Sequence, residues 1–275
     1  MEELQKKAEI LVEALQYAKQ FQGKVVVVKF GGNVMVNEEV TKSIFTDISI
    51  LKKMGLNVVL VHGGGPELDM EMIKANIPKR VIDGLRVTDA RTLEIAKSVF
   101  RKINDSCVHH LKENGSKAKD CTEDFMLTKI TDPRLGYVGE IVHVNSLLLK
   151  KAIRNGYIPV ISPLGKDKKG HVTNINADTV ATKIAQEMKA EKLTIITNVK
   201  GVRIEGKFIS TLSTADAKKY IESGEITSGM IPKVLACVEA VKHNVKKAHL
   251  INGDIKRALL LEIFTDQGIG TEIVK

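Results

Sequence analysis

The chain has 275 residues, of which 43% are apolar and 27% charged, as is ordinary for a folded protein of one large domain or two lobes. Its 42 basic and 33 acidic residues give a net charge of +9, which favours anionic ligands. Nucleic acid is a poor candidate, because only 4% of the residues are aromatic, there is no tryptophan, and no basic run is interleaved with aromatic side chains that could stack on bases.

Cysteine usage and the lack of long apolar segments indicate a cytoplasmic protein. Cys107, Cys121 and Cys237 show no CxxC spacing, so we expect reduced thiols. No cluster has the spacing of zinc ligands, and we predict no metal held by the protein alone. No segment reaches the about 18 apolar residues that span a bilayer, and the start, MEELQKKAEI, lacks the apolar core of a signal peptide. We therefore expect binding to neither membrane nor nucleic acid.

Residues 3–20 are predicted to form a helix with one narrow apolar stripe. The apolar residues recur at spacings of four and three, at Leu4, Ala8, Leu11, Leu15 and Ala18. The stripe could pack on its own domain or reach another subunit, and periodicity does not distinguish the two.

After this helix, short β-branched runs alternate with amphipathic stretches. Strands are predicted at 24–30, 57–61, 157–161, 193–197 and 248–251. Helices are predicted at 38–54, 66–76, 89–114, 145–155, 177–188, 214–223 and 231–244. Residues 137–144 alternate like an antiparallel strand, and 202–209 resemble a hairpin that turns at Gly206–Lys207. The fold prediction is α/β: a three-layer αβα sandwich with a mainly parallel central sheet and added β-hairpins.

Glycine clusters follow the first two predicted strands. VVVVKFGG ends with Lys29, Gly31 and Gly32, and the second strand runs into HGGGP at 62–66, before a helix. Glycine lets backbone N–H groups approach a phosphate, and a helix N-terminus adds oriented donors. Each cluster alone could be an ordinary turn, but two at adjacent strand ends favour a phosphate site. Neither GxxxxGK[ST] nor GxGxxG occurs, so P-loop and dinucleotide-binding sites are disfavoured.

Three further polar positions stand at predicted helix starts. Arg86 could bind a carboxylate through its guanidinium, or it could pair with Asp89, which would cap the following helix. The segment TNINAD at 173–178 holds three amide or carboxylate side chains, of which capping explains only one. Lys233 lies where a helix dipole repels cations unless an anion joins it. Two lysines, two glycine loops, an acid and an arginine together suggest phosphoryl transfer to a nucleophile that is already an anion, such as a carboxylate.

With these residues in place, the sequence resembles the amino-acid kinase family over nearly its whole length. The resemblance lies in seven ordered motifs: KFGGN (29–33), VHGGGP (61–66), GLRVTD (84–89), LGYVGEI (135–141), NINADTVA (174–181), GMIPK (229–233) and LLLEIFTDQGIGT (259–271). Within the family it is most similar to the branch that uses ATP to phosphorylate the side-chain carboxylate of N-acetyl-L-glutamate.

The resemblance implies a role for each motif. Lys29 and Lys233 would stabilise the transferring phosphoryl group, and Asp178 would hold both lysines. The phosphate-binding backbone would be Gly31, Gly32 and Gly63. The substrate-binding residues would be Gly64, Gly65, Arg86 and Asn174. ATP would enter with Mg²⁺ held largely by phosphates and water.

The same resemblance implies a domain organisation and an assembly. Residues 1–21 would form an inter-subunit helix, 22–180 the lobe that binds the acyl-amino acid, and 181–275 the nucleotide lobe. Members with such a helix form dimers and hexamers, as trimers of dimers, and are inhibited by L-arginine. The positions matching that effector site are Tyr17, Glu262 and Gly268. Arg257 stands where arginine-sensitive members carry histidine, and this extra cation would repel an arginine ligand.

Some positions depart from the family pattern and keep two alternatives open. The flap at 115–132 is shortened on what is expected to be the substrate side, Asn198 replaces an aspartate near the nucleotide, and Ser228 replaces a glycine. One alternative is a sister kinase that acts on carrier-bound aminoadipate or glutamate. The other is a weakly active regulatory paralogue that binds nucleotide.

Overall fold

The structure is a computed structural model that describes residues 1–31, 37–122, 125–227, 229–264 and 268–275. The helices are α1 (Glu2–Phe21), α2 (Glu38–Lys53), α3 (Gly65–Lys74), α4 (Ala90–Glu113), α5 (Ser146–Arg154), α6 (Ala177–Glu187), α7 (Thr214–Glu222), α8 (Ile231–Lys242), α9 (Ala258–Phe264) and the short 3₁₀ helix η2 (Pro133–Leu135). The strands are β1 (Val25–Phe30), β2 (Asn57–His62), β3 (Val81–Ile82), β4 (Leu85–Arg86), β5 (Ala118–Asp120), β6 (Met126–Lys129), β7 (Glu140–Val144), β8 (Ile158–Ile161), β9 (Leu164–Lys166), β10 (Val172–Asn174), β11 (Lys192–Thr197), β12 (Arg203–Ile204), β13 (Lys207–Phe208), β14 (Thr211–Ser213), β15 (Lys247–Asn252) and β16 (Thr271–Val274).

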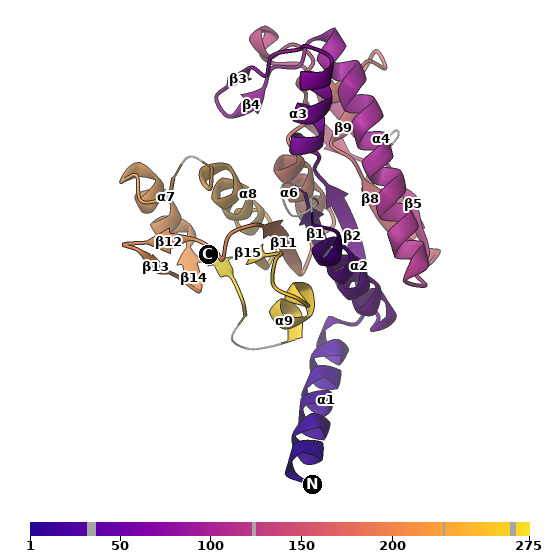
Figure 1. Cartoon of the computed structure of the whole chain (residues 1–275), viewed down its shortest axis with the longest axis vertical. Coiled ribbons are helices and arrows are strands. Elements are labelled where there is room, and N and C mark those ends of the chain that lie inside the picture. The colour runs from indigo at the N-terminus through magenta and orange to yellow at the C-terminus, as the bar shows by residue number, and fades with distance from the viewer. Residues whose placement is uncertain (32–36, 123–124, 228, 265–267) are drawn as a thin grey trace.

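An eight-stranded sheet runs through the molecule in the order β14-β16-β15-β11-β1-β2-β8-β5 (Figure 1). Neighbouring strands are parallel except β15 and β16, which pair antiparallel. The sheet therefore continues from one predicted lobe into the other. The five strands predicted from apolar runs are β1, β2, β8, β11 and β15, each within one residue at both ends.

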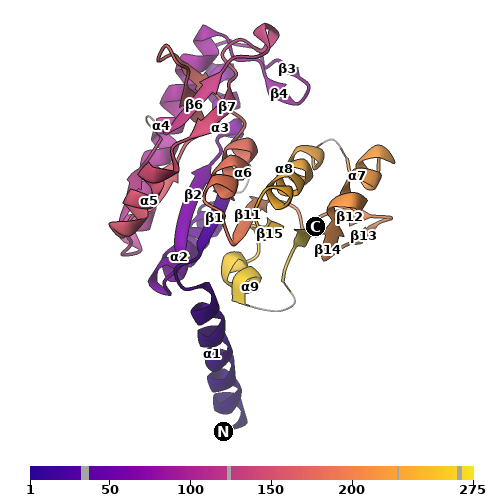
Figure 2. The ribbon, with the colours of Figure 1, turned by 180° about the vertical axis from the view of Figure 1, so that it is seen from behind.

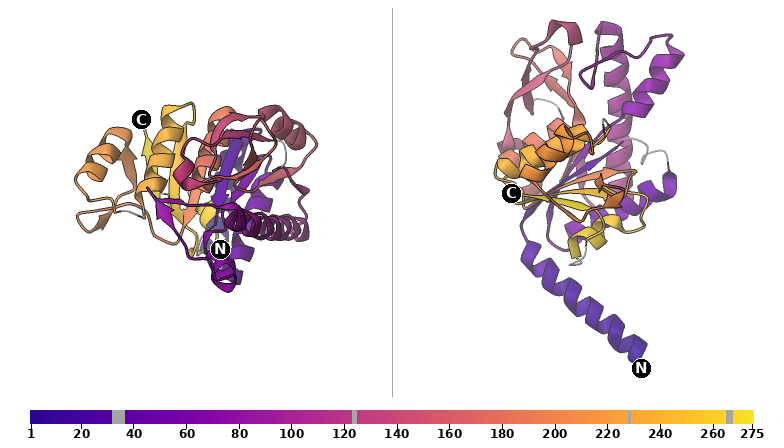
Figure 3. Two further views of the ribbon diagram at one scale, coloured as in Figure 1. Left: turned by 90° about the horizontal axis from the view of Figure 1, so that it is seen from above. Right: turned by 90° about the vertical axis from the view of Figure 1, so that its left-hand side faces the viewer.

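Helices cover both faces of this sheet, as the view from behind (Figure 2) and the views from above and from the side (Figure 3) show. On one face, α5, α6 and α8 pack against a core that includes Leu149, Val180 and Val234. On the other face, α2, α3, α4 and α9 close a second core that includes Phe45, Leu68 and Leu259. The predicted three-layer αβα sandwich is confirmed.

A second sheet, β10-β9-β6-β7, lies beyond the end of the main sheet that carries the glycine loops. Its strand β7 pairs antiparallel with β6, as the alternation at 137–144 predicted. The predicted hairpin is β12–β13, but it turns at Glu205 and Gly206, one residue earlier than expected. Both residues have positive φ, 47° and 80°, which glycine adopts without strain at the second position.

Helix α1 extends away from the body of the protein (Figures 1 and 3). Its last residue, Phe21, packs against the core under α2 and α9. Leu4 and Val12 on the same helix are 65% and 55% exposed. The helix thus leaves apolar side chains in solvent instead of burying them on its own domain.

Candidate functional site

A cavity of about 460 Å³ opens at the carboxyl ends of β1 and β2. Parallel strands carry their functional loops at this edge, so residues far apart in the sequence meet there. The predicted site residues that line the cavity are Lys29, Gly63, Gly64, Gly65, Arg86, Asn174 and Asp178. Gly32 lies outside the described residues.

Asp178 lies between two lysines at the back of this cavity. Lys29 Nζ is 2.9 Å from one carboxylate oxygen, and Lys233 Nζ donates to the other at 3.0 Å. Lys29 is the next-to-last residue of strand β1, Asp178 lies in the first turn of α6, and Lys233 lies in the first turn of α8. The side chains of Lys29 and Asp178 are each 8% exposed, whereas that of Lys233 is 27% exposed. The arrangement places two cations at one anion, and Lys233, the more exposed of the two, lies outside the residues that line the cavity.

The charge of Asp178 is stable in this environment. Burial alone raises the pKa of its carboxyl, but the charges and hydrogen bonds of Lys29 and Lys233 outweigh it and lower the pKa to about 2. Asp178 is therefore ionised throughout the neutral range and suits holding cations better than transferring protons.

The two glycine loops lie against each other. A Cβ on Gly31 would come within 2.8 Å of the Gly63 backbone, and Gly31 has φ +159°. Gly63 N–H donates to the Phe30 carbonyl at 2.7 Å, which continues the ladder between β1 and β2. Gly63 thus lines the cavity, but its only backbone donor is used within the protein.

Gly64 and Gly65 have backbone N–H groups without an acceptor among the described residues. Gly64 is the N-cap of α3, so both donors stand at the positive end of a helix. Gly64 has φ +153°, and a Cβ there would lie 2.6 Å from Ile103 and 2.9 Å from Phe100. Only glycine fits this position, and the pair forms a ready anion-binding corner.

The side chain of His62 contacts the same loop. It is fully buried, and its Nδ1 lies 2.7 Å from the Gly63 carbonyl oxygen. Burial lowers the pKa of this imidazole to about 4, so the ring is neutral at physiological pH and donates through Nδ1. No sequence pattern gives His62 a role, because the residue reads as the last position of the strand before the glycines.

Arg86, on β4, also lines the cavity. Its Nη2 is 2.5 Å from Asp69 on α3 and 3.3 Å from the Gly65 carbonyl oxygen, and its Nη1 is 3.2 Å from the Met72 sulfur. The alternative partner Asp89 instead caps α4, accepting from Thr92 N at 2.7 Å. The pairing of Arg86 with Asp89 is therefore wrong, whereas the predicted cap at Asp89 is confirmed, and Arg86 is one of the residues that line the cavity.

The TNINAD segment divides its three polar side chains as the sequence suggested. Asn176 caps α6 by accepting from Asp178 N and Thr179 N. Asn174, 9% exposed, donates to the Thr88 hydroxyl at 3.0 Å, and that hydroxyl donates to the Arg86 carbonyl. Asn174 and Asp178 are thereby left to face the cavity.

A separate cavity of about 420 Å³ is lined by two of the three predicted effector residues, Glu262 and Gly268, beside Phe21 at the end of α1. The Glu262 carboxylate contacts His249, lies 3.6 Å from Lys192 and accepts from Ile269 N at 3.0 Å. The side chain of Tyr17, the third effector residue, lies outside the described part of the structure.

Arg257 is placed differently from the expectation that it would repel an arginine ligand. Its guanidinium donates to the fully buried Asp47 on α2 at 3.0 Å, and Arg257 is absent from the lining of the cavity at Glu262. Its charge is compensated within the protein, so the repulsion argument loses its basis.

The flap at 115–132 was expected near the substrate. Its described residues include β5, at the edge of the main sheet, and β6, in the second sheet. None of these residues lines the cavity that holds Lys29 and Arg86. Asn198 is exposed just after β11, and Ser228 is outside the described residues.

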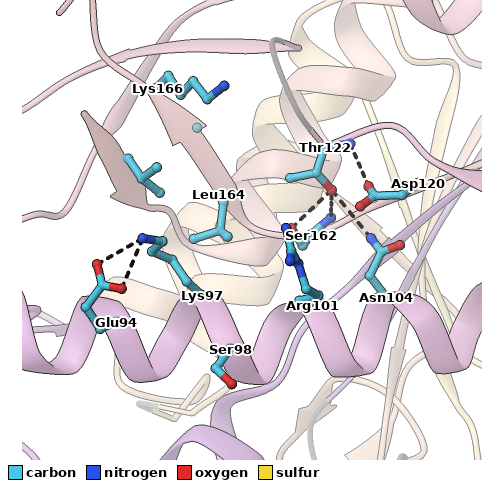
Figure 4. Close-up of a pocket in the computed structure, with 12 residues that line it drawn as sticks. Glu94, Lys97, Ser98, Arg101, Asn104, Asp120, Thr122, Ser162, Leu164 and Lys166 are labelled. Atoms are coloured by element: carbon cyan, nitrogen blue, oxygen red, sulfur yellow. Dashed lines mark hydrogen bonds and ion pairs between the residues drawn. The ribbon is translucent and has the colours of Figure 1, made fainter. Parts of the chain in front are cut away.

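Another cavity, of about 500 Å³, lies along α4 (Figure 4). Thr122 accepts there from the Ser162 N–H and hydroxyl, and Lys97 pairs with Glu94 on the same helix. Although it is slightly larger than the cavity at the glycine loops, it holds neither glycine loop nor the lysine–aspartate group. Chemistry, not volume, therefore selects the candidate active site.

Two properties bear on cofactors and location. In the described parts of the chain, no three or more His, Cys, Asp or Glu side chains cluster as a metal site. No helix there is long and apolar enough to span a membrane.

Comparison with known proteins gives a consistent family. The model of the amino acid kinase family matches residues 24–252. The acetylglutamate kinase of Caldicellulosiruptor bescii is 44% identical over 99% of this chain and 98% of that protein. The acetylglutamate kinase of Caldanaerobacter subterraneus is 46% identical over 98% of this chain and 93% of that protein.

Among solved structures, the N-acetylglutamate synthase of Neisseria gonorrhoeae, complexed with coenzyme A and N-acetyl-glutamate, superposes with a TM-score of 0.90 at 26% identity. The match covers 98% of this chain and 63% of the synthase chain, so this chain spans under two thirds of that protein.

Proposed function

The chain belongs to the amino acid kinase family and is homologous over nearly its whole length to acetylglutamate kinases, so it is an enzyme that uses ATP to phosphorylate N-acetyl-L-glutamate. We propose that the cavity at the ends of β1 and β2 is its active site. The family resemblance inferred from the seven motifs is confirmed. The observation that carries the site assignment is the Lys29–Asp178–Lys233 group, of which Lys29 and Asp178 line the same cavity as Gly64 and Gly65, whose N–H donors have no acceptor among the described residues.

The proposed chemistry is attack by the side-chain carboxylate of the substrate on the γ-phosphorus of ATP, giving an acyl phosphate and ADP. The nucleophile is already an anion, so no general base is needed. Lys29 and Lys233 neutralise negative charge on the phosphoryl oxygens during transfer, and Asp178 keeps both ammonium groups in place. Asp178 accepts no proton in this scheme, in keeping with its low pKa.

Substrate binding uses the other groups of the cavity. The N–H donors of Gly64 and Gly65 face the reacting carboxylate. Gly31, which has no Cβ, lets the Gly63 backbone lie against the end of β1, and its own backbone is proposed to bind phosphate. Arg86 binds the α-carboxylate, and Asn174 contacts the substrate beside it. Mg²⁺ accompanies ATP, held by phosphates and water, and supplies charge neutralisation when bound. Residues 22–180 serve the acyl-amino acid and 181–275 the nucleotide.

The alternatives have less support. The curated relatives are named acetylglutamate kinase, which disfavours a sister kinase for carrier-bound aminoadipate. A regulatory paralogue would not need the complete lysine–aspartate group of Lys29, Asp178 and Lys233. A coupled ADP assay with N-acetyl-L-glutamate, N-acetyl-L-aminoadipate and no acceptor tests the function. ADP release only with N-acetyl-L-glutamate supports it, and equal release in all three reactions contradicts it.

We further propose that the enzyme is cytoplasmic and forms dimers that assemble into a hexamer through α1. The exposure of Leu4 and Val12 on a helix that projects from the body supports the assembly through α1. Sedimentation of the full chain and of a chain lacking residues 1–21 tests it. We expect the full chain to be a hexamer and the shortened chain a dimer. An unchanged number of subunits after the deletion would contradict the role of α1.

L-Arginine is proposed as an inhibitor that binds the cavity lined by Glu262 and Gly268, close to the segment that carries Tyr17. The carboxylate of Glu262 is the natural partner of a guanidinium. The test is the ADP assay with added L-arginine, on wild type and Glu262→Gln. Inhibition of wild type alone is expected, and no inhibition of wild type refutes this effector.

A further inference from the structure

Asp69 on α3 binds two cations at the substrate end of the cavity. Its Oδ2 accepts from Lys79 Nζ at 2.8 Å, and its Oδ1 lies 2.5 Å from Arg86 Nη2. The three residues come from different segments: α3, the connection that follows it, and β4. The pattern repeats that of Lys29–Asp178–Lys233, with one carboxylate between two cations.

The two cations differ in how firmly they are held. The Arg86 side chain is 13% exposed and is also fixed by the Gly65 carbonyl and the Met72 sulfur. The Lys79 side chain is 52% exposed and has Asp69 as its single ion-pair partner among the described residues. Both line the cavity, and their two positive charges exceed the one negative charge of Asp69. This end of the cavity therefore carries a net positive charge.

Asp69 is ionised in this arrangement. Burial raises the pKa of its carboxyl, but the hydrogen bonds and charges of Lys79 and Arg86 outweigh that effect and lower it below the ordinary value. The carboxylate can thus hold both cations in the free enzyme.

A neighbouring ion pair shows that such a contact need not involve the cavity. Lys74, in the last turn of α3, donates to Glu71 at 2.7 Å, with both side chains well exposed, and neither residue lines the cavity. Exposed pairs of this kind contribute little to stability. Lys79 differs in that its partner also binds Arg86 and its side chain borders the substrate space.

We propose that Lys79 is a second cation for the α-carboxylate of the acyl-amino acid, and that Asp69 is the positioning residue that holds Lys79 and Arg86 for it. The proposal rests on the proposed function. Arg86 supplies a rigid fork, whereas Lys79 supplies an ammonium on a flexible stem that closes on the bound carboxylate. The cavity then recognises a dicarboxylate, with one carboxylate at Lys79 and Arg86 and the reacting one at Gly64 and Gly65.

The main test is Lys79→Gln with Lys74→Gln as the matched control. Lys79→Gln is expected to raise the KM for N-acetyl-L-glutamate about tenfold, while kcat and the KM for ATP change less than threefold. Lys74→Gln is expected to behave as wild type. If both variants have the same KM for N-acetyl-L-glutamate, the proposal is overturned.

A substrate analogue separates carboxylate binding from a general effect on the cavity. 4-Acetamidobutanoate keeps the acetamido group and the reacting carboxylate but has hydrogen in place of the α-carboxylate. Used as a competitive inhibitor, it needs no turnover. Its Ki should be equal in wild type and Lys79→Gln, and a Ki that rises as much as the KM would contradict the assignment.

Asp69 is tested by Asp69→Asn and the conservative Asp69→Glu. Asp69→Asn should raise the KM for N-acetyl-L-glutamate at least as much as Lys79→Gln, and Asp69→Glu should restore part of it. A lowered KM in Asp69→Asn would show that Asp69 competes with the substrate and would overturn its positioning role. If wild type releases no ADP with N-acetyl-L-glutamate, the proposed function itself fails. If wild type is active and Lys79→Gln matches Lys74→Gln, only this inference fails.

Discussion

Replacing Asp178 with asparagine tests the idea that one carboxylate positions both catalytic cations. The change removes the negative charge that lies 2.9 Å from Lys29 Nζ and 3.0 Å from Lys233 Nζ. Without it the two ammonium groups repel each other and lose their shared partner. We expect kcat to fall by about 10²–10³, on the scale of losing one transition-state charge stabiliser.

The structure also gives the expected loss of stability. A pKa of about 2 for Asp178, in place of the ordinary 3.8, corresponds to about 2 kcal/mol of stabilisation of the folded state at neutral pH. In Asp178→Asn the buried Lys29 also loses its partner, and uncompensated buried charges cost about 3–5 kcal/mol. We therefore expect the free energy of unfolding to fall by about 2–5 kcal/mol.

Asp47→Asn is the matched control. Asp47 is a fully buried aspartate that pairs with Arg257 at 3.0 Å and does not line the cavity. Burial raises its pKa despite that partner, so the folded state gains little from its charge. We expect Asp47→Asn to change kcat less than threefold.

Both variants are compared by ADP release at saturating substrates and by urea unfolding at pH 7. The expected result is a large loss of kcat in Asp178→Asn that exceeds its loss of folded protein. If Asp178→Asn keeps more than a third of the wild-type kcat, or loses no more kcat than Asp47→Asn does, then Asp178 does not hold Lys29 and Lys233 for catalysis.

Three further predictions concern acidity, the glycine loop and the arginine. Folding lowers the pKa of Asp178, so the stabilisation from its charge is present above pH 4 and is lost as the pH falls towards 2. The difference in unfolding free energy between wild type and Asp178→Asn should therefore shrink from pH 6 to pH 3, and a constant difference would contradict this. Gly64→Ala should lower the free energy of unfolding by about 1–3 kcal/mol, because the added Cβ would lie 2.6 Å from Ile103. Gly65→Ala should change it by less than about 0.5 kcal/mol, because a Cβ there meets nothing within 4 Å. Equal effects of the two substitutions in thermal unfolding would contradict the close fit at Gly64. Arg86→Lys should raise the KM for N-acetyl-L-glutamate about 10–100-fold in steady-state assays through loss of the bidentate fork, and an unchanged KM rules out that contact.

Much of the site could be predicted because it lies at strand ends. Lys29 and the first two glycine clusters follow continuous apolar runs, and parallel strands bring their carboxyl ends together. Capping predicted that one of the three polar side chains at 174–178 is used by the helix, and the structure identifies that residue as Asn176. The distant Lys233 was recognisable because a cation at a helix start needs an anion.

Other features required the tertiary structure. Asp69 and Lys79 lie in an amphipathic stretch and its connection, where charged residues are usual, and only the fold brings them to Arg86. The backbone donor of Gly63 is used by Phe30, which no sequence pattern announces. The strands of the second sheet are three to five residues long, so their periodicity is weak, and only the pairing of β6 with β9 spans a long sequence separation.

The most direct test of the central claim is detection of the acyl phosphate itself. Wild-type enzyme is incubated with ATP, Mg²⁺ and N-acetyl-L-glutamate in hydroxylamine, which converts acyl phosphates into hydroxamates. We predict one hydroxamate per ADP released, none without N-acetyl-L-glutamate, and about 10²–10³-fold less with Asp178→Asn in the same time. ADP release without hydroxamate, or hydroxamate formation that is unaffected in Asp178→Asn, would contradict the assignment of this reaction to the cavity at Lys29, Asp178 and Lys233.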